Sequence, residues 1–192
     1  MNINENKLKK RLFVAIELPE DIRCSIYKLA INMFENNKYA RVVAASNIHL
    51  TLKFLGDTEI NKIEKIKEAI KAAADQFEKF NYKISGAVNA FPDPRNARIV
   101  FLEVDSGGEQ ICKIYNELED NLSKIKIKRE KKKFSPHVTI VRMKNRENIN
   151  ELIASCEKKI NAVLNCKNLT LFESQLRPEG ARYTILDRFS LK

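Results

Sequence analysis

The sequence predicts an α+β fold: a bilobal duplicated unit in which two antiparallel-rich sheets face a central cleft and helices lie on the outside. Three observations support this prediction. Strand-like and helical segments follow one another in the same order twice. The pattern His-x-Thr occurs once in each half, at His49 and His137, which are the two histidines of the chain. An arginine stands at a similar distance before each of them, Arg11 and Arg98.

Repetition of this kind is typical of a duplicated supersecondary unit. We therefore expect one domain over residues 1–192, with pseudo-symmetric lobes at about 11–97 and 98–192. The chain termini can cross between the lobes. A pseudo-twofold axis would then bring the two His-x-Thr segments face to face across the cleft.

The first half of the chain reads as strand, helix, strand, helix. The run "RLFVAIELP" at 11–19 is apolar, β-branched and closed by proline, as in a strand, and apolar residues at helical spacing follow it over 22–33. "NIHLTLKFLG" at 47–56 alternates polar and apolar residues, which predicts a half-buried strand ended by the glycine. Apolar positions at helical spacing predict an amphipathic helix over 59–80.

The second half repeats this order. "NYKISGAVNAF" at 81–91 and "RIVFLEV" at 98–104 predict strands, and the apolar spacing over 111–125 predicts a helix. After the second His-x-Thr strand, residues 149–160 predict another helix, and residues 169–191 predict a closing hairpin around "RPEGA".

The composition is that of a globular chain. It has 192 residues, 44% of them hydrophobic and 31% charged, which is enough to bury a core and unlike a disordered tail. No apolar run approaches the roughly 20 residues that cross a bilayer, and the N-terminus lacks a signal-peptide pattern, so we expect a cytoplasmic protein without membrane contact.

The four cysteines show no C-x-x-C spacing, and we expect them to be reduced. A zinc site made of two cysteines and the two histidines would need paired ligand spacing, which the sequence lacks. The sequence thus predicts no metal and no cofactor.

The net charge of +10 is concentrated in one segment. "KIKIKREKKK", Lys124 to Lys133, contains seven Lys or Arg and one Glu, and it ends shortly before His137. A basic stretch is often only a solvated surface, but beside a candidate site it can also steer a polyanion. The charge pattern therefore favours nucleic acid as the partner.

Each His-x-Thr segment places an imidazole and a hydroxyl on the same face of a strand. Two imidazoles that share one cleft can act as general acid and general base, because a pKa near ~6.5 allows either protonation state at working pH. Thr51 and Thr139 could donate to the non-bridging oxygens of a phosphate held between them. The residues alone do not decide which histidine is the acid.

Other common reaction classes lack their motifs. There is no G-x-S-x-G nucleophile elbow, and there is neither a G-x-x-x-x-G-K-[ST] nor a G-x-G-x-x-G loop. The sequence thus gives no support to a serine hydrolase or a P-loop nucleotide hydrolase.

Beyond His-x-Thr, longer stretches resemble the two-histidine (2H) phosphoesterase superfamily, in particular its RNA 2′,3′-cyclic phosphodiesterase, or 2′-5′ RNA ligase-like, branch. The resemblance covers nearly the whole chain and rests on five stretches: "RLFVAIELPEDIR", "NIHLTLKFLG", "FPDPRNARIVFLEV", "FSPHVTIVR" and "LFESQLRPEGARYTILDRFSL". It implies a bilobal α+β fold with both motifs in a central cleft.

The resemblance also implies an activity: metal-independent hydrolysis of RNA 2′,3′-cyclic phosphate ends, possible substrates including tRNA fragments, to 2′-phosphomonoesters by a monomeric enzyme. In that reading His49 is the proton donor to the leaving 3′ oxygen, and His137 is the proton acceptor that activates water. Thr51 and Thr139 hold the phosphate.

Four cations are weaker candidates for substrate contact. By strict alternation Lys53 shares the strand face of His49 and Thr51. Arg142 falls on the opposite face from its histidine, but a β-bulge would reverse that, and the family pattern favours it. Arg95 and Arg98 flank the central loop and could contact RNA phosphates. For all four, a surface charge or a scaffold ion pair is an equally good explanation.

The chain departs from the family at one aromatic position. Relatives often carry an aromatic residue before the first motif, where this chain has Val42, and it has no tryptophan. If that aromatic stacks a base, Phe54, Phe134 or Tyr183 would have to do so here.

Three alternatives share these motifs. The same histidines could join a cyclic phosphate to a 5′-hydroxyl, as an ATP-independent 2′-5′ RNA ligase. The chain could be a non-catalytic RNA-binding module, although intact histidines and threonines argue against this. A small cyclic nucleotide or an ADP-ribose cyclic phosphate could also be the substrate.

Overall fold

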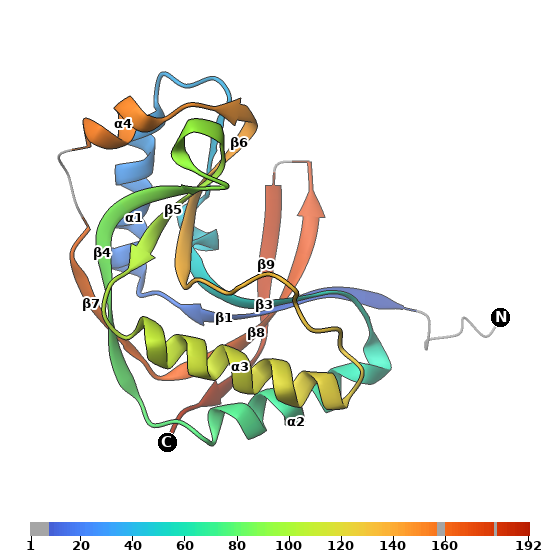
Figure 1. Ribbon diagram of the computed structural model, residues 1–192. Coiled ribbons are helices and arrows are strands. Elements are labelled where there is room, and N and C mark those ends of the chain that lie inside the picture. Colours follow the sequence, from blue (N-terminus) through green and yellow to red (C-terminus); the bar gives the residue numbers. More distant parts are fainter. Residues whose placement is uncertain (1–7, 157–159, 179) are drawn as a thin grey trace.

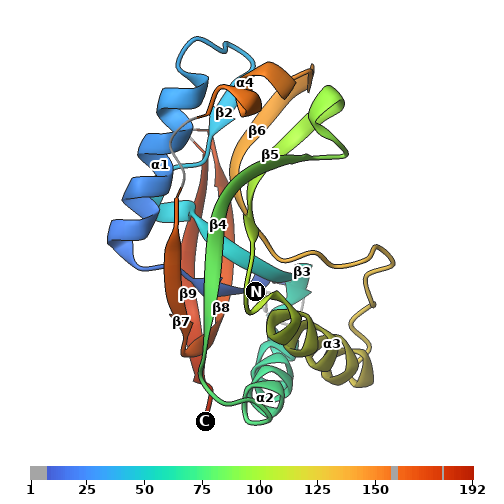
Figure 2. The ribbon, with the colours of Figure 1, turned by 60° about the vertical axis from the view of Figure 1, so that its left-hand side comes forward.

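The computed structural model describes residues 8–156, 160–178 and 180–192 of the chain. Figures 1 and 2 show a strongly curled, mostly antiparallel sheet with α-helices packed against it. This arrangement confirms the predicted α+β class. The strands are β1 Lys9–Glu17, β2 Ala40–Val42, β3 His49–Glu59, β4 Phe80–Phe91, β5 Ala97–Val104, β6 His137–Glu147, β7 Ala162–Cys166, β8 Asn168–Arg177 and β9 Gly180–Ser190. The α-helices are α1 Glu20–Phe34, α2 Ile63–Ala74, α3 Gly108–Lys124 and α4 Asn150–Ala154.

The strand order shows how the sheet is divided. It runs β7-β4-β5-β6-β3-β1-β8-β9, with β2 paired to β6. The two central strands, β3 and β6, are joined through one register pair, Leu50 with Val138. The sheet is thus continuous but narrow at its middle, with β1, β3, β8 and β9 on one side of that pair and the other strands on the other side. The C-terminal hairpin lies on the side that holds the N-terminal strand, and we propose these two sides as the lobes of a single domain.

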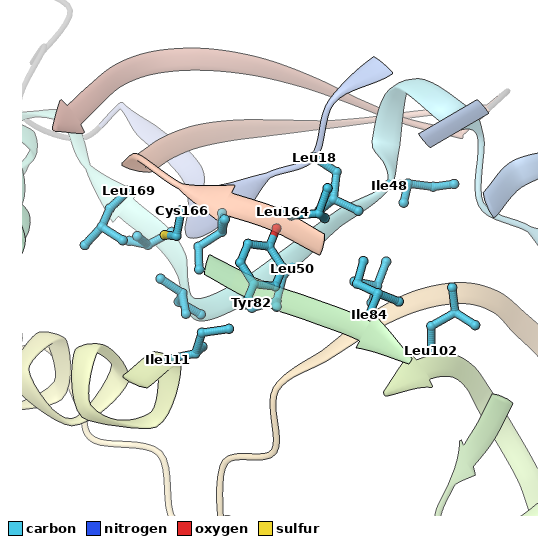
Figure 3. Close-up of a cluster of buried hydrophobic side chains, with 14 of the residues drawn as sticks. Leu18, Ile48, Leu50, Tyr82, Ile84, Leu102, Ile111, Leu164, Cys166 and Leu169 are labelled. Carbon is cyan, nitrogen blue, oxygen red and sulfur yellow. The ribbon is translucent and has the colours of Figure 1, made fainter. Parts of the chain in front are cut away.

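One face of the sheet and the apolar sides of the three long helices enclose the main core. Fully buried side chains from β1, β3, β4, β5 and α3 meet there, and Figure 3 shows ten labelled members, among them Leu50, Tyr82, Leu102 and Ile111. Alternation then places the odd residues of β1 on the other face of the sheet, where Phe13 and Ala15 form a small separate cluster with Phe172.

Two helices are shorter in the structure than the sequence pattern predicted. The helix expected over 59–80 begins with a 3₁₀ turn, Ile60–Lys62, and its α-helical part ends at Ala74, because residues from Phe80 onward pair as β4 with β7. The helix expected over 149–160 is the short α4, and its residues 157–159 lie outside the described part. Strand β7 was not predicted. Within the described residues, no helix combines the length and apolarity that crossing a membrane requires.

The two motif strands share an irregularity that alternation alone could not predict. Between Thr51 and Lys53, β3 advances by two residues while its partner β1 advances by only one. Leu52 is therefore the extra residue of a β-bulge. On β6 the register with β5 passes in the same way from Thr139 to Val141, so Ile140 is bulged. A bulge reverses the facing of every residue beyond it. The two bulges occupy equivalent positions, three residues after each histidine, which fits the pseudo-symmetry of the motifs.

Candidate active site

The Leu50–Val138 pair brings the two motifs together. Both side chains are fully buried in the main core, so the residues that flank them point to the opposite face of the sheet. In an antiparallel pair with this register, His49 lies beside Thr139 and Thr51 lies beside His137. A single backbone contact therefore places two imidazoles and two hydroxyls on one face.

The two imidazoles are held by the same device. Nδ1 of His49 is 2.8 Å from the carbonyl oxygen of Asn47, and Nδ1 of His137 is 2.7 Å from the carbonyl oxygen of Ser135. A carbonyl can only accept, so Nδ1 carries the proton in both rings and Nε2 is the nitrogen available for proton transfer. In the sequence, each of these carbonyls stands two residues before its histidine.

The first histidine is also bonded to its own threonine. Nε2 of His49 lies 2.9 Å from Oγ1 of Thr51. With a neutral ring the Thr51 hydroxyl donates this bond, and with a protonated ring it accepts it. The ring of His49 packs 4.9 Å from Phe13 and edge-on to Tyr183 at 5.4 Å, both measured between ring centroids.

The second histidine is packed against a pair of stacked phenylalanines. Phe91 and Phe101 stack with their ring centroids 4.3 Å apart, and each lies 5.1 Å from the ring of His137. These aromatic contacts hold both imidazoles in an apolar setting on the site face of the sheet.

This setting favours the neutral imidazole in both cases. Burial lowers the pKa of His49 to about 4; the bond to Asn47 opposes this shift, while the charges of Arg142 and His137 add to it. Burial also lowers the pKa of His137, opposed by the bond to Ser135 and reinforced by Arg142. Without a bound anion, both rings are therefore neutral near pH 7.

A cavity of about 730 Å³ opens beside these groups. Thr51, His137 and Thr139 line it, and Thr51 connects it to His49, which is not itself among its lining residues. This volume is within the range of small-molecule binding sites. The cationic and aromatic residues that line the cavity are Lys53, Phe54, Phe91, Arg98, Tyr115, Lys132, Lys133, Phe134, Arg142 and Arg146.

The bulge on β6 brings Arg142 to the site. Strict alternation placed it on the face opposite to His137, but Ile140 is bulged, so Arg142 pairs with Ile99 and lines the cavity as an exposed cation. The possibility of a bulge, for which Arg142 was retained as a candidate, is therefore confirmed.

The bulge on β3 has the opposite effect on Lys53, and the alternation argument for this residue was wrong. Beyond Leu52, Lys53 pairs with the core residue Val14, and only 4% of its side chain is exposed. Its ammonium lies 2.5 Å from Oε1 of Glu119 and 3.0 Å from the carbonyl oxygen of Lys128. Phe54 instead takes the site face and is 64% exposed.

The remaining predicted binding residues are divided between the cavity and its surroundings. Arg98 lines the cavity and donates to the carbonyl oxygen of Lys144 at 2.6 Å. Phe134 lines it and stacks on Tyr115, with ring centroids 4.2 Å apart. Tyr183 contacts His49 from β9, on the same side of the sheet as β3, and is not among the lining residues. Arg95 is exposed on a 3₁₀ turn and does not line the cavity either.

Sequence reasoning did not single out several residues that the fold brings to the site. Arg146 lines the cavity although only its place late in β6 connects it with the motif. Tyr115 and Glu119 come from α3, where the helical pattern marked only core positions. Asn47 could have been noticed, because it stands two residues before His49, as Ser135 does before His137. Its side-chain amide nitrogen also donates to the carbonyl oxygen of Ala181 in β9, at 2.6 Å.

The described residues form no cluster of metal ligands. Among them, no group of three or more His, Cys, Asp or Glu side chains is placed to hold a metal ion. Among the cysteines, Cys24 is exposed, Cys112 and Cys156 are partly buried, and Cys166 is fully buried.

Comparison with known proteins shows which family the chain resembles. A protein named RNA 2′,3′-cyclic phosphodiesterase from Methanothermobacter thermautotrophicus is 29% identical over 187 residues, 96% of this chain and 100% of that one. The crystal structure of TT0787 of Thermus thermophilus has a TM-score of 0.78 at 23% identity, covering 94% of this chain and 97% of that one. The structure of Escherichia coli LigT complexed with 3′-AMP has a TM-score of 0.75 at 23% identity, covering 97% of this chain and 99% of that one.

These two structures share the fold of the chain. The family model described as the 2′-5′ RNA ligase superfamily matches residues 19–177, which include both His-x-Thr motifs and most of the strands. The chain therefore belongs to the 2′-5′ RNA ligase superfamily, as its motifs indicated.

Proposed function

We propose that this protein hydrolyses RNA 2′,3′-cyclic phosphate ends to 2′-phosphomonoesters, using His49 and His137 as acid and base and no metal ion. The observation that carries the proposal is the pairing of Leu50 with Val138, which sets the two His-x-Thr motifs side by side on one face. The name of the relative from M. thermautotrophicus, an RNA 2′,3′-cyclic phosphodiesterase, supports the same substrate class.

The reaction needs one proton removed and one proton supplied. Nε2 of His137, which lines the cavity, takes a proton from water as the water oxygen forms a bond to phosphorus. The bond from phosphorus to the 3′ oxygen breaks, and Nε2–H of His49 donates its proton to that oxygen. The products are a 2′-phosphomonoester and a 3′-hydroxyl. Afterwards His137 releases its extra proton to solvent, and His49 takes up a proton from solvent.

The proton on His49 depends on the substrate. In the free protein the pKa of His49 is about 4, so the ring is neutral. A bound phosphodiester anion favours the imidazolium and raises that pKa. Thr51 is already bonded to Nε2 and can turn from donor to acceptor when the ring is charged. Substrate binding would thus favour the protonated form of His49, which is the form that can act as the acid.

The charges around the cavity support an RNA substrate. Lys132, Lys133, Arg98, Arg142 and Arg146 all line it, on a chain of net charge +10. Phosphate contacts by such residues give most of the sequence-independent affinity for nucleic acid. The aromatic rings of Phe54 and Phe134 provide stacking surfaces in the same cavity.

A second candidate activity uses the same groups. A 5′-hydroxyl in place of water would give 2′-5′ ligation, and the name of the superfamily favours testing it. Supplying a strand with a 5′-hydroxyl and looking for joined product would separate ligation from hydrolysis.

The direct test is turnover by purified protein kept in EDTA, with an oligoribonucleotide that ends in a 2′,3′-cyclic phosphate. We expect a product with a 2′-phosphate, identified by its resistance to a 3′-phosphate-specific phosphatase, and no product with His137→Ala. A 3′-phosphate product, or full activity of the variant, would contradict the proposal.

A further inference from the structure

The segment between α3 and β6, residues 125–136, is a connector that supplies part of the cavity wall. It contains Lys132, Lys133, Phe134 and Ser135, all of which line the cavity. The carbonyl of Ser135 also holds Nδ1 of His137. Figures 1 and 2 show it as a long irregular loop that leaves the end of α3 and crosses the open side of the sheet to reach β6. Such a segment needs an anchor, because no helix or strand fixes its backbone.

The anchor is a buried ion pair under the connector. Lys53 on β3 and Glu119 on α3 form it, and their side chains are 4% and 5% exposed. Each partner also bonds to the backbone of the connector: Lys53 donates to the carbonyl oxygen of Lys128 at 3.0 Å, and Oε2 of Glu119 accepts from the N–H of Glu130 at 3.2 Å. Lys53 and Glu119, which come from different elements, thus hold the connector backbone at two residues, Lys128 and Glu130.

Further contacts extend this grip toward the cavity. Oε1 of Glu130 accepts from the N–H of Lys131 at 2.9 Å and of Lys132 at 3.4 Å. Four residues after Glu130, the ring of Phe134 stacks on Tyr115, which lies one helical turn before Glu119 on α3, with an angle of 6° between the ring planes. The ion pair and the stack therefore fix the connector on both sides of the two lysines.

A buried ion pair is a poor choice for stability alone. Its charges lose their hydration, and apolar residues of similar volume are often at least as stable in the same place. What an apolar pair could not do is hold the carbonyl of Lys128 and the N–H of Glu130 in fixed positions. The contacts made by this pair thus point to a role in placing the backbone.

We infer that Lys53 and Glu119 are positioning residues, which hold the connector so that its lysines and Phe134 face the substrate and its Ser135 carbonyl orients His137. The kinetic part of this inference rests on the proposed function. Both residues line the cavity, but their side chains are only 4% and 5% exposed, and their charged atoms bond to each other and to the connector, so in this inference they act through the connector. The inference also gives Lys53 a role other than the direct substrate contact that its sequence position suggested.

The test separates position from stability. Lys53→Met alone leaves the Glu119 carboxylate buried without a cation and should lower Tm. The double variant Lys53→Met/Glu119→Leu removes both charges and should recover most of that loss. We expect the double variant still to show kcat reduced on the order of 10- to 100-fold, because His137 is no longer oriented. Its KM should rise more for an oligonucleotide than for a mononucleoside 2′,3′-cyclic phosphate.

The matched control removes an exposed pair. Lys71→Met/Asp75→Leu deletes the i,i+4 ion pair on α2, whose side chains are 65% and 45% exposed. It should leave kcat, KM and Tm close to those of the wild type. Wild-type kcat and KM in the Lys53→Met/Glu119→Leu variant would overturn the inference, whatever its Tm.

Hydrogen exchange provides a readout that needs no activity. Amides of residues 128–133 should exchange faster in the double variant than in the wild type, and unchanged exchange would also contradict the inference. If the double variant does not fold, Glu119→Gln, which keeps the size but replaces one acceptor oxygen with a donor, should show the same increase. If the wild type turns over no cyclic phosphate, the proposed function fails while the exchange measurement still tests the anchor.

Discussion

At the scale of single residues, the chemistry depends on which nitrogen of each imidazole carries the proton. Both Nδ1 atoms are bonded to carbonyl oxygens two residues earlier, so Nε2 is the atom that would transfer a proton in each ring of the proposed mechanism. The two rings thus have the same tautomer and the same orienting bond, as a pseudo-symmetric acid and base require, since each must gain or lose its proton at the same atom. What distinguishes them is their surroundings, in particular the bond of His49 to Thr51.

Arg142 sets the charge next to both rings. It lowers the pKa of His49 and of His137. The chain has only two histidines, so each can be followed by NMR titration without overlap. We expect Arg142→Met to raise both pKa values relative to the wild type. Arg95→Met, a matched loss of an exposed arginine outside the cavity, should leave them unchanged; equal titration curves for Arg142→Met and wild type would show that Arg142 does not act on the site.

The lowered pKa of His49 should also make the free energy of unfolding depend on pH. The unfolded chain binds a proton at His49 below a pKa near ~6.5, whereas the folded protein does so only near a pKa of about 4. The contribution of His49 is therefore complete above pH 6.5 and is lost as the pH falls toward 4, a change on the order of 3 kcal/mol. Urea unfolding at pH 7.5 and 4.5 should show a smaller pH effect in His49→Gln than in the wild type. Equal losses in both proteins would argue against the lowered pKa.

At the scale of elements, the two bulges decide which side chains reach the site. The strands themselves could be predicted, because β1, β3, β5 and the closing hairpin have clear apolar alternation or runs. The bulges at Leu52 and Ile140 could not, since they follow from the fit between curled neighbouring strands and leave no mark in the residue pattern. Lys53 was therefore misplaced while both histidines, which precede the bulges, were placed on the correct face.

The end of α3 offers a test of local strain at the start of the connector. Lys126 has a φ of 64°, the left-handed region that glycine adopts without cost. The N–H groups of Lys126 and Ile127 bond to the carbonyls of Ser123 and Leu122, so Lys126 occupies the C′ position of a Schellman motif. We expect Lys126→Gly to raise the free energy of unfolding by about 0.5 to 1 kcal/mol in urea titrations. A decrease would mean that the lysine side chain contributes more than the backbone strain costs.

At the scale of the whole molecule, the sheet narrows to one register pair between β3 and β6, and cationic side chains line the cavity that opens beside the two motifs. The α+β class and the opposed motifs followed from repeated patterns. The pairing of the C-terminal hairpin with the N-terminal strand is encoded by no local pattern: β8 pairs with β1 across more than 150 positions of sequence separation, for example Val14 with Leu171. The cavity residues of α3 were hidden for the same reason, since only the packed fold brings that helix to the site.

The lysines of the basic run, Lys124 to Lys133, should contribute unequally to RNA binding. Among its residues, Lys132 and Lys133 line the cavity, whereas Lys126 and Lys131 are not among the lining residues. Lys132→Gln/Lys133→Gln should raise KM for an oligonucleotide more than for a mononucleotide. It should also flatten the dependence of log affinity on log salt by about 0.7 for each phosphate that is no longer neutralised. Lys126→Gln/Lys131→Gln is the charge-matched control, and equal effects of the two pairs would mean that only net charge matters.

The proposed chemistry depends on His49 and His137 acting as complementary acid and base on one phosphate. The decisive measurement replaces the 3′ oxygen of the cyclic phosphate by sulfur, because a thiolate leaves without needing a proton. We predict that His49→Ala, nearly inactive on the oxygen substrate, recovers most of the wild-type rate on the sulfur substrate, while His137→Ala stays inactive on both. Recovery by His137→Ala instead would reverse the two roles, and recovery by neither would contradict acid–base catalysis by this pair.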